Sequence, residues 1–559
     1  MDDHKLRELV EGVKDGAISR RAFMRRMAAV GVAAPFASQI LAWNGVAMAQ
    51  ASLAYKPTKA GGGGPLKILL WQAPTLLNPH FASGTKDQIA GRIFFEPLAG
   101  WDKEGNLTPQ LAAEVPTRAN GGLSEDGKVV TWKLKQGVKW HDGKPFTADD
   151  VVFSLDKFHR EVHPRWRPIV NAQVEKIEKV DDLTVRITLK QPFGPMIMTQ
   201  EVASAPMIPK HIYDGTDYRA NPANNTPIGT GPYKFKEWKK GSYIHLVRNE
   251  DYWLKDRPNL DEIYWQIIPD AAARAVAYET GKVDVLTGGS VDVYDVQRLA
   301  KLPNSCMTTK GWEMFAPHAW VAINHRNGIL ANKQFRQGLM YAIDREFGKD
   351  VVWGGLGKLP TGPISSKTKF YSADVPKYGF DPAKAKELIK ASGYKGETIK
   401  LLGIPYGETW SRWAEAIKQN FEDVGVKVQI ENTDVPGWTQ KTSNWDFDLT
   451  FNFLYQLGDP AMGVARSYVS TNIVKGNPFA NIGGYSNPEV DKLFADAAIA
   501  PTDKDRQELY TKVQKLLAEE LPVLWLLEMD FPTIYRCNVK NLVTTGIGVN
   551  DGFREAWKE

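Results

Sequence analysis

The chain has 559 residues, of which 43% are hydrophobic, with 70 Lys and Arg against 65 Asp and Glu. This length exceeds what one hydrophobic core usually organises, so we expect two or three domains. The net charge of +5 is small and evenly spread along the chain, so neither nucleic acid nor an anionic membrane surface is expected as a partner.

The amino-terminal segment is typical of a twin-arginine export signal. Arg20 and Arg21 precede a weakly apolar stretch over residues 27–46, and small residues end at Ala49. Polar residues interrupt this stretch, which falls short of the roughly 20 apolar residues that a membrane anchor needs. We predict a signal peptide over residues 1–49, cleavage after Ala49, and a periplasmic mature chain. Cleavage would remove seven basic and five acidic residues and leave 63 and 60.

The chain contains two cysteines, Cys306 and Cys537, and neither lies near Ala49. A lipid anchor at the cleavage site is therefore not expected. In an oxidising compartment the two thiols can form one disulfide, but the sequence does not tell whether their Cα atoms come within bonding range. A disulfide and a pair of structural thiols both remain open, and a metal or redox role is not expected.

In the first half of the folded chain, predicted strands outnumber predicted helices. Residues 50–65, with four consecutive glycines, predict a flexible linker. An apolar strand is predicted over residues 66–71, and apolar residues at helical spacing predict a helix over residues 88–98. A strand at residues 129–134 leads through a polar turn to a helix that begins after Thr147. Further strands are predicted over residues 183–189, 244–247 and 263–268.

The second half alternates strands and helices, with clear helix boundaries. Asn332 is predicted to cap a helix whose inner face holds Phe335, Leu339, Ile343 and Phe347, and Asp381-Pro382 begins the next one. A β-α-β order, which favours a partly parallel sheet, is predicted over residues 399–403, 408–424 and 426–430. Helices over residues 488–498 and 503–519 precede a last strand over residues 522–527.

Enzyme motifs are weak in this chain. His159 and His163 are four residues apart, but the glutamate between them is not placed as in His-Glu-x-x-His, so we expect the end of a surface helix and no metal site. Neither a P-loop nor a Gly-x-Ser-x-Gly motif occurs in the sequence. We expect a non-catalytic protein without a cofactor. The alternative from another class is a secreted hydrolase that is exported already folded.

Residues 126–155, DGKVVTWKLKQGVKWHDGKPFTADDVVFSL, resemble the signature of the family 5 extracellular solute-binding proteins, the peptide- and nickel-type receptors of ABC importers. Shorter matches follow one another in the family's order along nearly the whole mature chain. They lie at residues 77–80, 96–98, 109–112, 229–233, 248–253, 281–284, 335–345 and 487–491.

The resemblance implies an α/β, two-lobed periplasmic-binding-protein fold (type II, large cluster) with a small domain inserted in lobe one. The chain would cross between the lobes near residues 312–323 and 521–527, so that the lobes close on a ligand as a hinge. A monomer that delivers its ligand to an ABC permease in the inner membrane is implied. Lobe one would hold residues 66–108, 226–310 and 527–559, the insertion residues 109–225, and lobe two residues 311–526.

The resemblance also implies where a peptide would bind. In peptide receptors of the family an aspartate neutralises the peptide's α-ammonium group, and the matching position here is Gln456. A neutral amide cannot supply that charge-assisted contact. Asp459 lies nearby and is interpreted first as a turn residue. Gln456 and Asp459 are both kept as candidate ligand-binding residues. A peptide or peptide-like solute is the predicted ligand, and a non-peptide solute such as an oligosaccharide or an opine-like conjugate is the alternative.

The remaining candidate ligand-binding residues are mostly aromatic. Trp438 and Tyr455 are favoured, because we expect both on loops, and loops carry binding groups. Trp413 shares a helical face with Ile417 and is expected in the core. Lys86 is a candidate partner for an anionic ligand. The other aromatic candidates are Tyr406, Trp410 and Trp320.

Overall fold

The computed structural model describes residues 3–15, 17–18, 20–29, 64–82, 85–162, 170–200 and 205–559. Contacts divide the chain into two compact units, residues 1–58 and 59–559. In the first unit, α1 spans Asp3–Lys14 and α2 spans Arg20–Ala29. Arg20 and Arg21 of the predicted signal thus begin α2. The predicted cleavage after Ala49 and most of the predicted linker lie outside the described residues.

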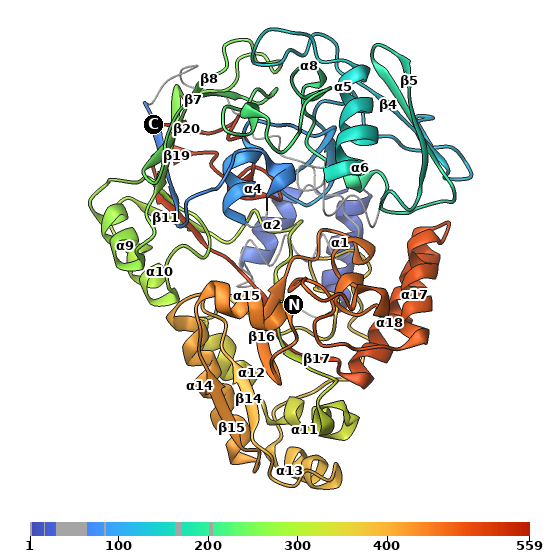
Figure 1. Ribbon diagram of the computed structural model, residues 1–559, viewed down its shortest axis with the longest axis vertical. Helices are drawn as coiled ribbons and strands as arrows, with labels where there is room; N and C mark the ends of the chain where they lie inside the picture. The colour runs from blue at the N-terminus through green and yellow to red at the C-terminus, as the bar shows by residue number, and fades with distance from the viewer. Residues whose placement is uncertain are drawn as a thin grey trace. The chain divides into compact units, whose positions relative to one another are not determined.

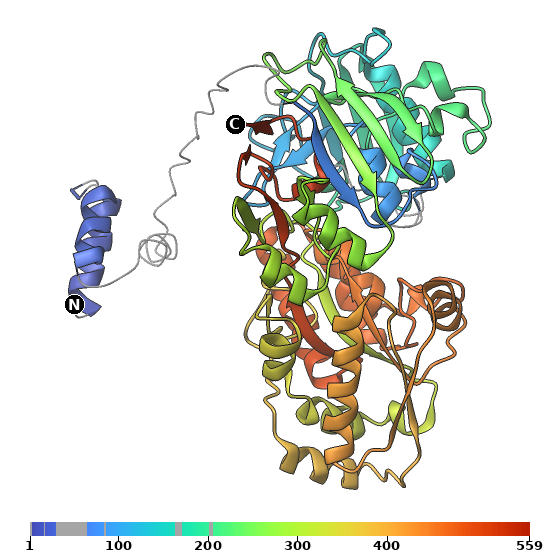
Figure 2. The ribbon, with the colours of Figure 1, turned by 90° about the vertical axis from the view of Figure 1, so that its left-hand side faces the viewer.

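The second unit contains two large sheets, each with its own core (Figure 1, Figure 2). The first is seven-stranded, in the order β11-β18-β10-β1-β9-β8-β7. β1 pairs in parallel with β9, from Leu66 opposite Ile263 to Leu70 opposite Ile267. Its strands are β1 (Leu66–Leu70), β7 (Tyr233–Lys239), β8 (Tyr243–Arg248), β9 (Glu262–Ile267), β10 (Val285–Leu286), β11 (Ser305–Thr308) and β18 (Thr533–Arg536).

Both faces of this sheet are covered, because side chains of β1 enter two different hydrophobic clusters. Ile68 packs with α4 (Thr85–Arg92), whereas Leu69 packs with α9 (Ala271–Glu279) and α10 (Val293–Leu299). A strand that is buried on both faces has a nearly continuous run of apolar residues in its sequence. This run explains why the sequence alone predicted the position of β1 so well.

The second sheet is six-stranded, in the order β13-β17-β12-β16-β14-β15. The predicted β-α-β unit is confirmed, since β14 pairs in parallel with β15 and α14 connects them. Its strands are β12 (His318–Ile323), β13 (Gly357–Lys358), β14 (Ile399–Leu402), β15 (Val428–Glu431), β16 (Leu449–Leu454) and β17 (Val523–Met529). Its main helices are α11 (Lys333–Ala342), α13 (Pro382–Ala391), α14 (Glu408–Asp423), α15 (Val435–Ser443), α17 (Pro488–Ile499) and α18 (Asp503–Glu520).

Two segments connect the sheets, and they differ from the predicted crossings. β12 already belongs to the second sheet, so the first crossing is confined to residues 309–317. β17 stays in the second sheet as far as Met529, so the return crossing is residues 530–532 and the predicted boundary at residue 527 is wrong. The apolar run of β17 ends at Leu527, before Glu528, so only the pairing with β12 and β13 shows that the strand continues to Met529.

The predicted insertion contains a separate three-stranded antiparallel sheet, in the order β4-β6-β5. Its core packs Trp132 and Trp140 with Val185 and Ile187. The hairpin of β2 (Ala99–Trp101) and β3 (Leu107–Pro109) leads into it. Its elements are β4 (Val129–Lys133), α5 (Ala148–Val152), α6 (His159–Val162), β5 (Val174–Asp181), β6 (Thr184–Leu189) and α8 (Lys210–Tyr213).

Two predicted helices are shorter in the structure. The helix predicted over residues 88–98 ends at Arg92, and the carbonyl of Phe94 accepts a hydrogen bond from Gly231 (3.0 Å) instead of continuing the helix. The helix capped by Asn332 ends at Ala342, and the Asp344 side chain caps a new turn. Phe347 therefore leaves the inner face and is 45% exposed.

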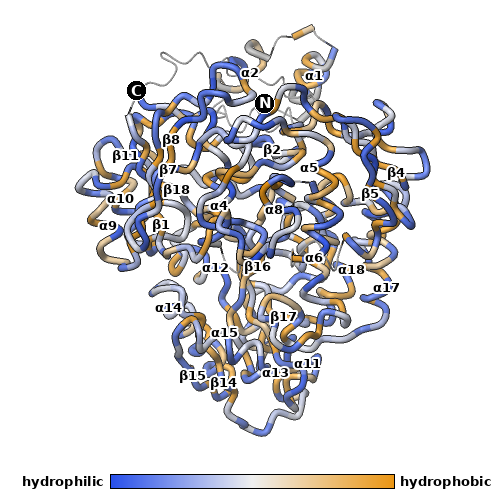
Figure 3. Tube along the Cα trace, turned by 45° about the horizontal axis from the view of Figure 1, so that its top comes forward, coloured by the Kyte–Doolittle hydropathy of each residue, from blue (hydrophilic) through white to orange (hydrophobic). Residues whose placement is uncertain are grey.

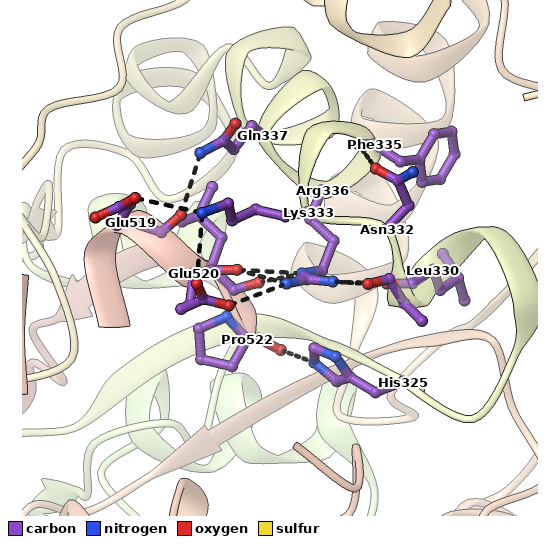
Figure 4. Close-up of polar contacts among 12 residues, drawn as sticks. His325, Leu330, Asn332, Lys333, Phe335, Arg336, Gln337, Glu519, Glu520 and Pro522 are labelled. Atoms are coloured by element: carbon purple, nitrogen blue, oxygen red, sulfur yellow. Dashed lines mark hydrogen bonds and ion pairs between the residues drawn. The ribbon is translucent and has the colours of Figure 1, made fainter. Parts of the chain in front are cut away.

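Arg336 of α11 holds the carboxyl-terminal end of α18 (Figure 4). The guanidinium group donates to the carbonyls of Glu520 (2.7 Å) and Leu521 (2.9 Å), and also to that of Ala331 (2.7 Å). A cation at a helix carboxyl terminus satisfies free carbonyls and complements the helix dipole. This contact fixes the end of α18 directly before β17.

Cys306 and Cys537 form a disulfide with a Cα–Cα distance of 5.1 Å. It links β11 to the residue that follows β18. The sequence left this pairing open, and the antiparallel register of β11 and β18 decides it, because Cys306 lies opposite Tyr535. The carboxyl-terminal segment with β19 (Val539–Lys540) and β20 (Trp557–Lys558) is thereby attached to the first sheet.

Hydrophilic and hydrophobic residues alternate over short distances along the described trace (Figure 3). Among the described residues, no helix combines the length and the apolar character that a bilayer crossing requires.

Candidate functional site

An aromatic cluster lies where the two crossing segments meet lobe two. We call it the hinge cluster; its residues are Trp312, Phe315, Phe453, Tyr455 and Phe531. The first crossing supplies Trp312 and Phe315, the second supplies Phe531, and the end of β16 and the loop after it supply Phe453 and Tyr455. Ring centroids are 5.0 Å apart for Trp312 and Phe531, and 5.1 Å apart for Phe315 and Tyr455. Aromatic packing at these distances contributes about 0.5–1.5 kcal/mol per pair beyond area burial.

Glycine brings lobe one close to this cluster. A Cβ atom at Gly288, the second residue after β10, would lie 2.6 Å from the Cβ of Phe531 and 3.0 Å from the Trp312 ring. Only a residue without a side chain allows this approach. The hinge cluster therefore contacts both lobes.

Tyr406 and Trp410 extend the cluster into lobe two. The Trp410 ring stacks on Phe453, with centroids 5.7 Å apart and planes 15° apart, and Tyr406 meets Phe453 edge-on at 6.1 Å. Trp410 is buried, whereas Tyr406, Phe453 and Tyr455 are half-buried. Burial raises the pKa of the Tyr406 hydroxyl, which therefore stays protonated at neutral pH and can donate a hydrogen bond. The half-buried rings present an apolar surface with hydroxyl groups at its edge.

The Gln456 side chain makes three hydrogen bonds within the protein, and its contact with a ligand stays a prediction. Its side-chain amide donates to the Pro363 carbonyl (2.8 Å) and to His318 Nδ1 (2.9 Å), and its Oε1 accepts from the Ser365 backbone N–H (2.8 Å). The side chain is 3% exposed. Gln456 thus ties the loop at residues 363–365 to β12.

Asp459 caps α16 (Pro460–Gly463) and pairs with Arg506, which agrees with its interpretation as a turn residue. Its contact with a ligand stays a prediction. Its carboxylate accepts two hydrogen bonds from the guanidinium group, at 2.8 and 2.9 Å, and both side chains are buried. Such a pair needs both partners, because either charge alone would be buried without compensation.

Three other candidates are also occupied by contacts within the protein. Trp438 lies in α15 and not on a loop; its side chain is fully buried, and its indole N–H donates to Thr450 (3.0 Å). Trp320 is buried in β12. The Lys86 ammonium group lies 3.0 Å from the Asp87 carboxylate. Trp413 is 1% exposed, as expected for a core residue.

The histidine pair also differs from its prediction. His159 is fully buried, and its ring centroid lies 4.4 Å from that of His80, so it is not at the end of a surface helix. His163 lies outside the described residues. Within the part of the chain that is described, no three His, Cys, Asp or Glu side chains come together as metal ligands.

Four of the motifs that carried the family resemblance, at residues 96–98, 109–112, 229–233 and 248–253, meet at the buried carboxylate of Glu96. It accepts hydrogen bonds from Gln110 (3.0 Å), Thr230 (3.0 Å), Tyr252 (2.7 Å) and Trp253 (2.8 Å). Burial raises the pKa of Glu96, and the hydrogen bonds from Tyr252, Gln110 and Trp253 oppose that shift. These four motifs therefore hold segments of lobe one together, and Gln110 ties the start of the insertion to them.

Sequence reasoning missed most of the hinge cluster. Trp312 and Phe315 lie in the crossing predicted near residues 312–323, and Phe531 follows the one predicted near residues 521–527. This position was the only signal that could have identified them. Phe315 and Phe453 are ordinary apolar residues in the sequence, and only the folded chain brings them to Tyr455.

Known proteins share this sequence pattern and this architecture. Residues 106–475 match the family model described as bacterial extracellular solute-binding proteins, family 5 middle. The chain is 29% identical to the oligopeptide-binding protein AppA of Bacillus subtilis, over 83% of this chain and 86% of that protein. It is 28% identical to the glutathione-binding protein GsiB of Pectobacterium atrosepticum, over 81% of this chain and 86% of that one. The solved structure of Bacillus subtilis AppA in complex with a nonapeptide aligns with a TM-score of 0.76 at 25% identity, covering 90% of this chain and all of that one.

Proposed function

Because the chain belongs to family 5 of the bacterial extracellular solute-binding proteins, we propose that it is the substrate-binding component of an ABC importer for a peptide or peptide-like solute. The relatives named for oligopeptide and glutathione support a ligand of this class. The two lobes close on the solute about the crossings at residues 309–317 and 530–532, and the closed complex delivers it to a permease in the inner membrane. The main structural support for this proposal is the hinge cluster, which joins both crossings to lobe two.

The chemistry of the cluster favours a solute with an apolar or aromatic side chain. Tyr406, Phe453 and Tyr455 offer flat apolar surface, and burying such surface drives binding. The two tyrosine hydroxyls can orient polar groups of the solute by hydrogen bonds.

Recognition of a free α-ammonium group at position 456 is disfavoured. The Gln456 amide is neutral and is already bonded to His318, Pro363 and Ser365. A buried ammonium group without a carboxylate would lose its hydration without compensation. A solute whose amino end is blocked or lies away from position 456 fits this site better than an ordinary dipeptide.

Export by the twin-arginine machinery and a periplasmic location rest on Arg20, Arg21 and the small residues before Ala49. Processing after Ala49 can be tested by amino-terminal sequencing of protein isolated from the periplasm. An intact amino terminus on periplasmic protein would refute the predicted cleavage.

The decisive experiment is native mass spectrometry of the protein isolated from the periplasm of its own host. We expect a bound small molecule that is released unchanged, and fragmentation identifies its class. The rival hydrolase predicts instead that the released compound is a cleavage product.

Tyr455→Ala and Phe453→Ala should weaken binding of the released compound by about 1–3 kcal/mol. Phe479→Ala is the matched control, because Phe479 is 41% exposed and lies outside the hinge cluster. Equal affinity of all three variants would contradict the proposed site.

A further inference from the structure

Asp292 of lobe one reaches the first turn of α14 in lobe two. It directly precedes α10, a helix of the seven-stranded sheet's lobe, which Figure 1 shows at the border with lobe two. Its Oδ1 accepts a hydrogen bond from the Thr409 hydroxyl at 3.3 Å and from the Thr409 backbone N–H at 3.5 Å. Thr409 is the second residue of α14, so its backbone N–H is one of those that a helix leaves without a partner.

α14 has no capping side chain of its own. Its N-cap position is Gly407, which makes no side-chain hydrogen bond and has a φ of 106°. A Cβ atom at this position would lie 2.9 Å from Asp292 Oδ1. Glycine therefore leaves the space that the carboxylate occupies, and Asp292 serves as the cap from the opposite lobe. A negative charge at a helix amino terminus is also favoured by the helix dipole.

Two further contacts of α10 reach lobe two beside this cap. The Arg412 guanidinium carbon of α14 lies 4.4 Å from the centre of the Tyr294 ring, a cation–π contact. A Cβ atom at Gly354 would lie 2.6 Å from the Gln297 side-chain nitrogen and 2.7 Å from a Val293 methyl group. α10 thus makes contacts along its length with two separate segments of lobe two.

We propose that Asp292 and α10 form a latch that caps α14 across the boundary between the lobes. The latch thereby favours the closed arrangement, by which we mean the one in which these contacts form. The inference rests on the proposed function, because closure matters for a receptor that traps its solute. Opening the lobes separates Asp292 from Thr409 and leaves the first turn of α14 without a cap. The cap forms in the closed arrangement whether or not a solute is bound, so it raises the fraction of closed molecules. Because the closed arrangement is the one that holds the solute, the same contact also raises the apparent affinity for the solute.

The test needs no solute, so it can fail independently of the proposed function. Asp292→Ala removes the cap, and Asp295→Ala is the matched control, because Asp295 lies on the same helix and pairs with Arg298 of lobe one at 2.6 Å. Protein dialysed free of small solutes is compared by hydrogen exchange of a peptide over residues 404–413 and by X-ray scattering. For Asp292→Ala we expect about two- to tenfold faster exchange in this peptide, unchanged exchange over residues 414–423, and a larger radius of gyration than for the wild type.

Thr409→Val provides a second variant that removes the hydroxyl partner from the other lobe. It should increase the radius of gyration by less than Asp292→Ala does, because the backbone N–H of residue 409 still donates to Asp292. The double variant should not exceed Asp292→Ala, since that change already removes both hydrogen bonds. Unchanged exchange and an unchanged radius of gyration for Asp292→Ala would overturn the proposal. Faster exchange without expansion would also overturn it, since it would indicate a cap that does not hold the lobes. The same expansion in Asp295→Ala would exclude a role specific to Asp292.

Discussion

The Tyr252 hydroxyl donates a hydrogen bond of 2.7 Å to the carboxylate of Glu96, across 156 positions of sequence. Gln110, Thr230 and Trp253 donate to the same carboxylate. All four groups act as donors, and an ionised carboxylate is a side chain that offers acceptors only. Arg554 adds a positive charge that stabilises Glu96 and bonds to Tyr252.

Replacing this carboxylate should destabilise the empty protein. Glu96→Gln turns an N–H₂ group toward two of the donors, and each donor left without an acceptor costs about 1–3 kcal/mol. Urea unfolding of the unliganded protein measures this loss. Glu104→Gln is the matched control, because the Glu104 side chain is largely exposed in the hairpin between β2 and β3. Equal stability of both variants would show that the four hydrogen bonds contribute nothing net.

Gln456→Ala should lower stability even without a solute. The change removes the acceptor of the Ser365 backbone N–H and the donor to Pro363, and a buried polar group without a partner costs about 1–3 kcal/mol. Thermal unfolding of the empty protein is the measurement, with Gln419→Ala as the control, because Gln419 lies on the exposed side of α14. A variant with normal stability but weakened binding would restore the ligand-contact role of Gln456.

Trp438→Ala should unfold more easily than the wild type by about 3–5 kcal/mol, because the side chain is fully buried. Trp438→Phe keeps most of the volume and loses the hydrogen bond to Thr450 (3.0 Å), so its loss should be smaller, about 1–3 kcal/mol. Chemical denaturation of the three proteins gives the comparison. A stable Trp438→Ala protein that binds poorly would place this residue in the site instead of the core.

His318 should contribute to loss of stability in acid. Burial lowers the pKa of its imidazole from 6.5 to about 3. The unfolded chain takes up this proton first, so the contribution is fully present above pH 6.5 and is lost as the pH falls toward 3. The free energy of unfolding should fall through this group by up to about 1.4 kcal/mol per pH unit.

The comparison that isolates His318 is His318→Asn, measured by denaturation from pH 8 to pH 4. The difference in free energy between the two proteins should be constant from pH 7 to pH 8 and shrink below pH 6.5, where only the wild type loses this contribution. Parallel curves over the whole range would mean that folding does not shift the pKa of His318.

The elements that local sequence predicted well are those with strong local signals. The cap residues Asn332 and Asp381 begin α11 and α13 as expected, and the parallel pairing of β14 with β15 follows from the short connections around α14. The helix predicted to continue through Phe94 fails for the opposite reason. The Phe94 carbonyl accepts a hydrogen bond from Gly231, 137 positions away, and no local sequence pattern can predict that partner.

By itself the sequence determined the family, the two-lobed architecture and the position of most strands and helices, because periodicity, caps and motif order are local properties of the chain. Tertiary structure alone decided which polar and aromatic residues are available to a solute. Trp438 and Gln456 have the residue types of binding groups, but packing buries the first and hydrogen bonds to Ser365 and Pro363 occupy the second. The hinge cluster and the Asp292–Thr409 contact join residues from separate segments, and such contacts exist only once the chain has crossed between its two sheets.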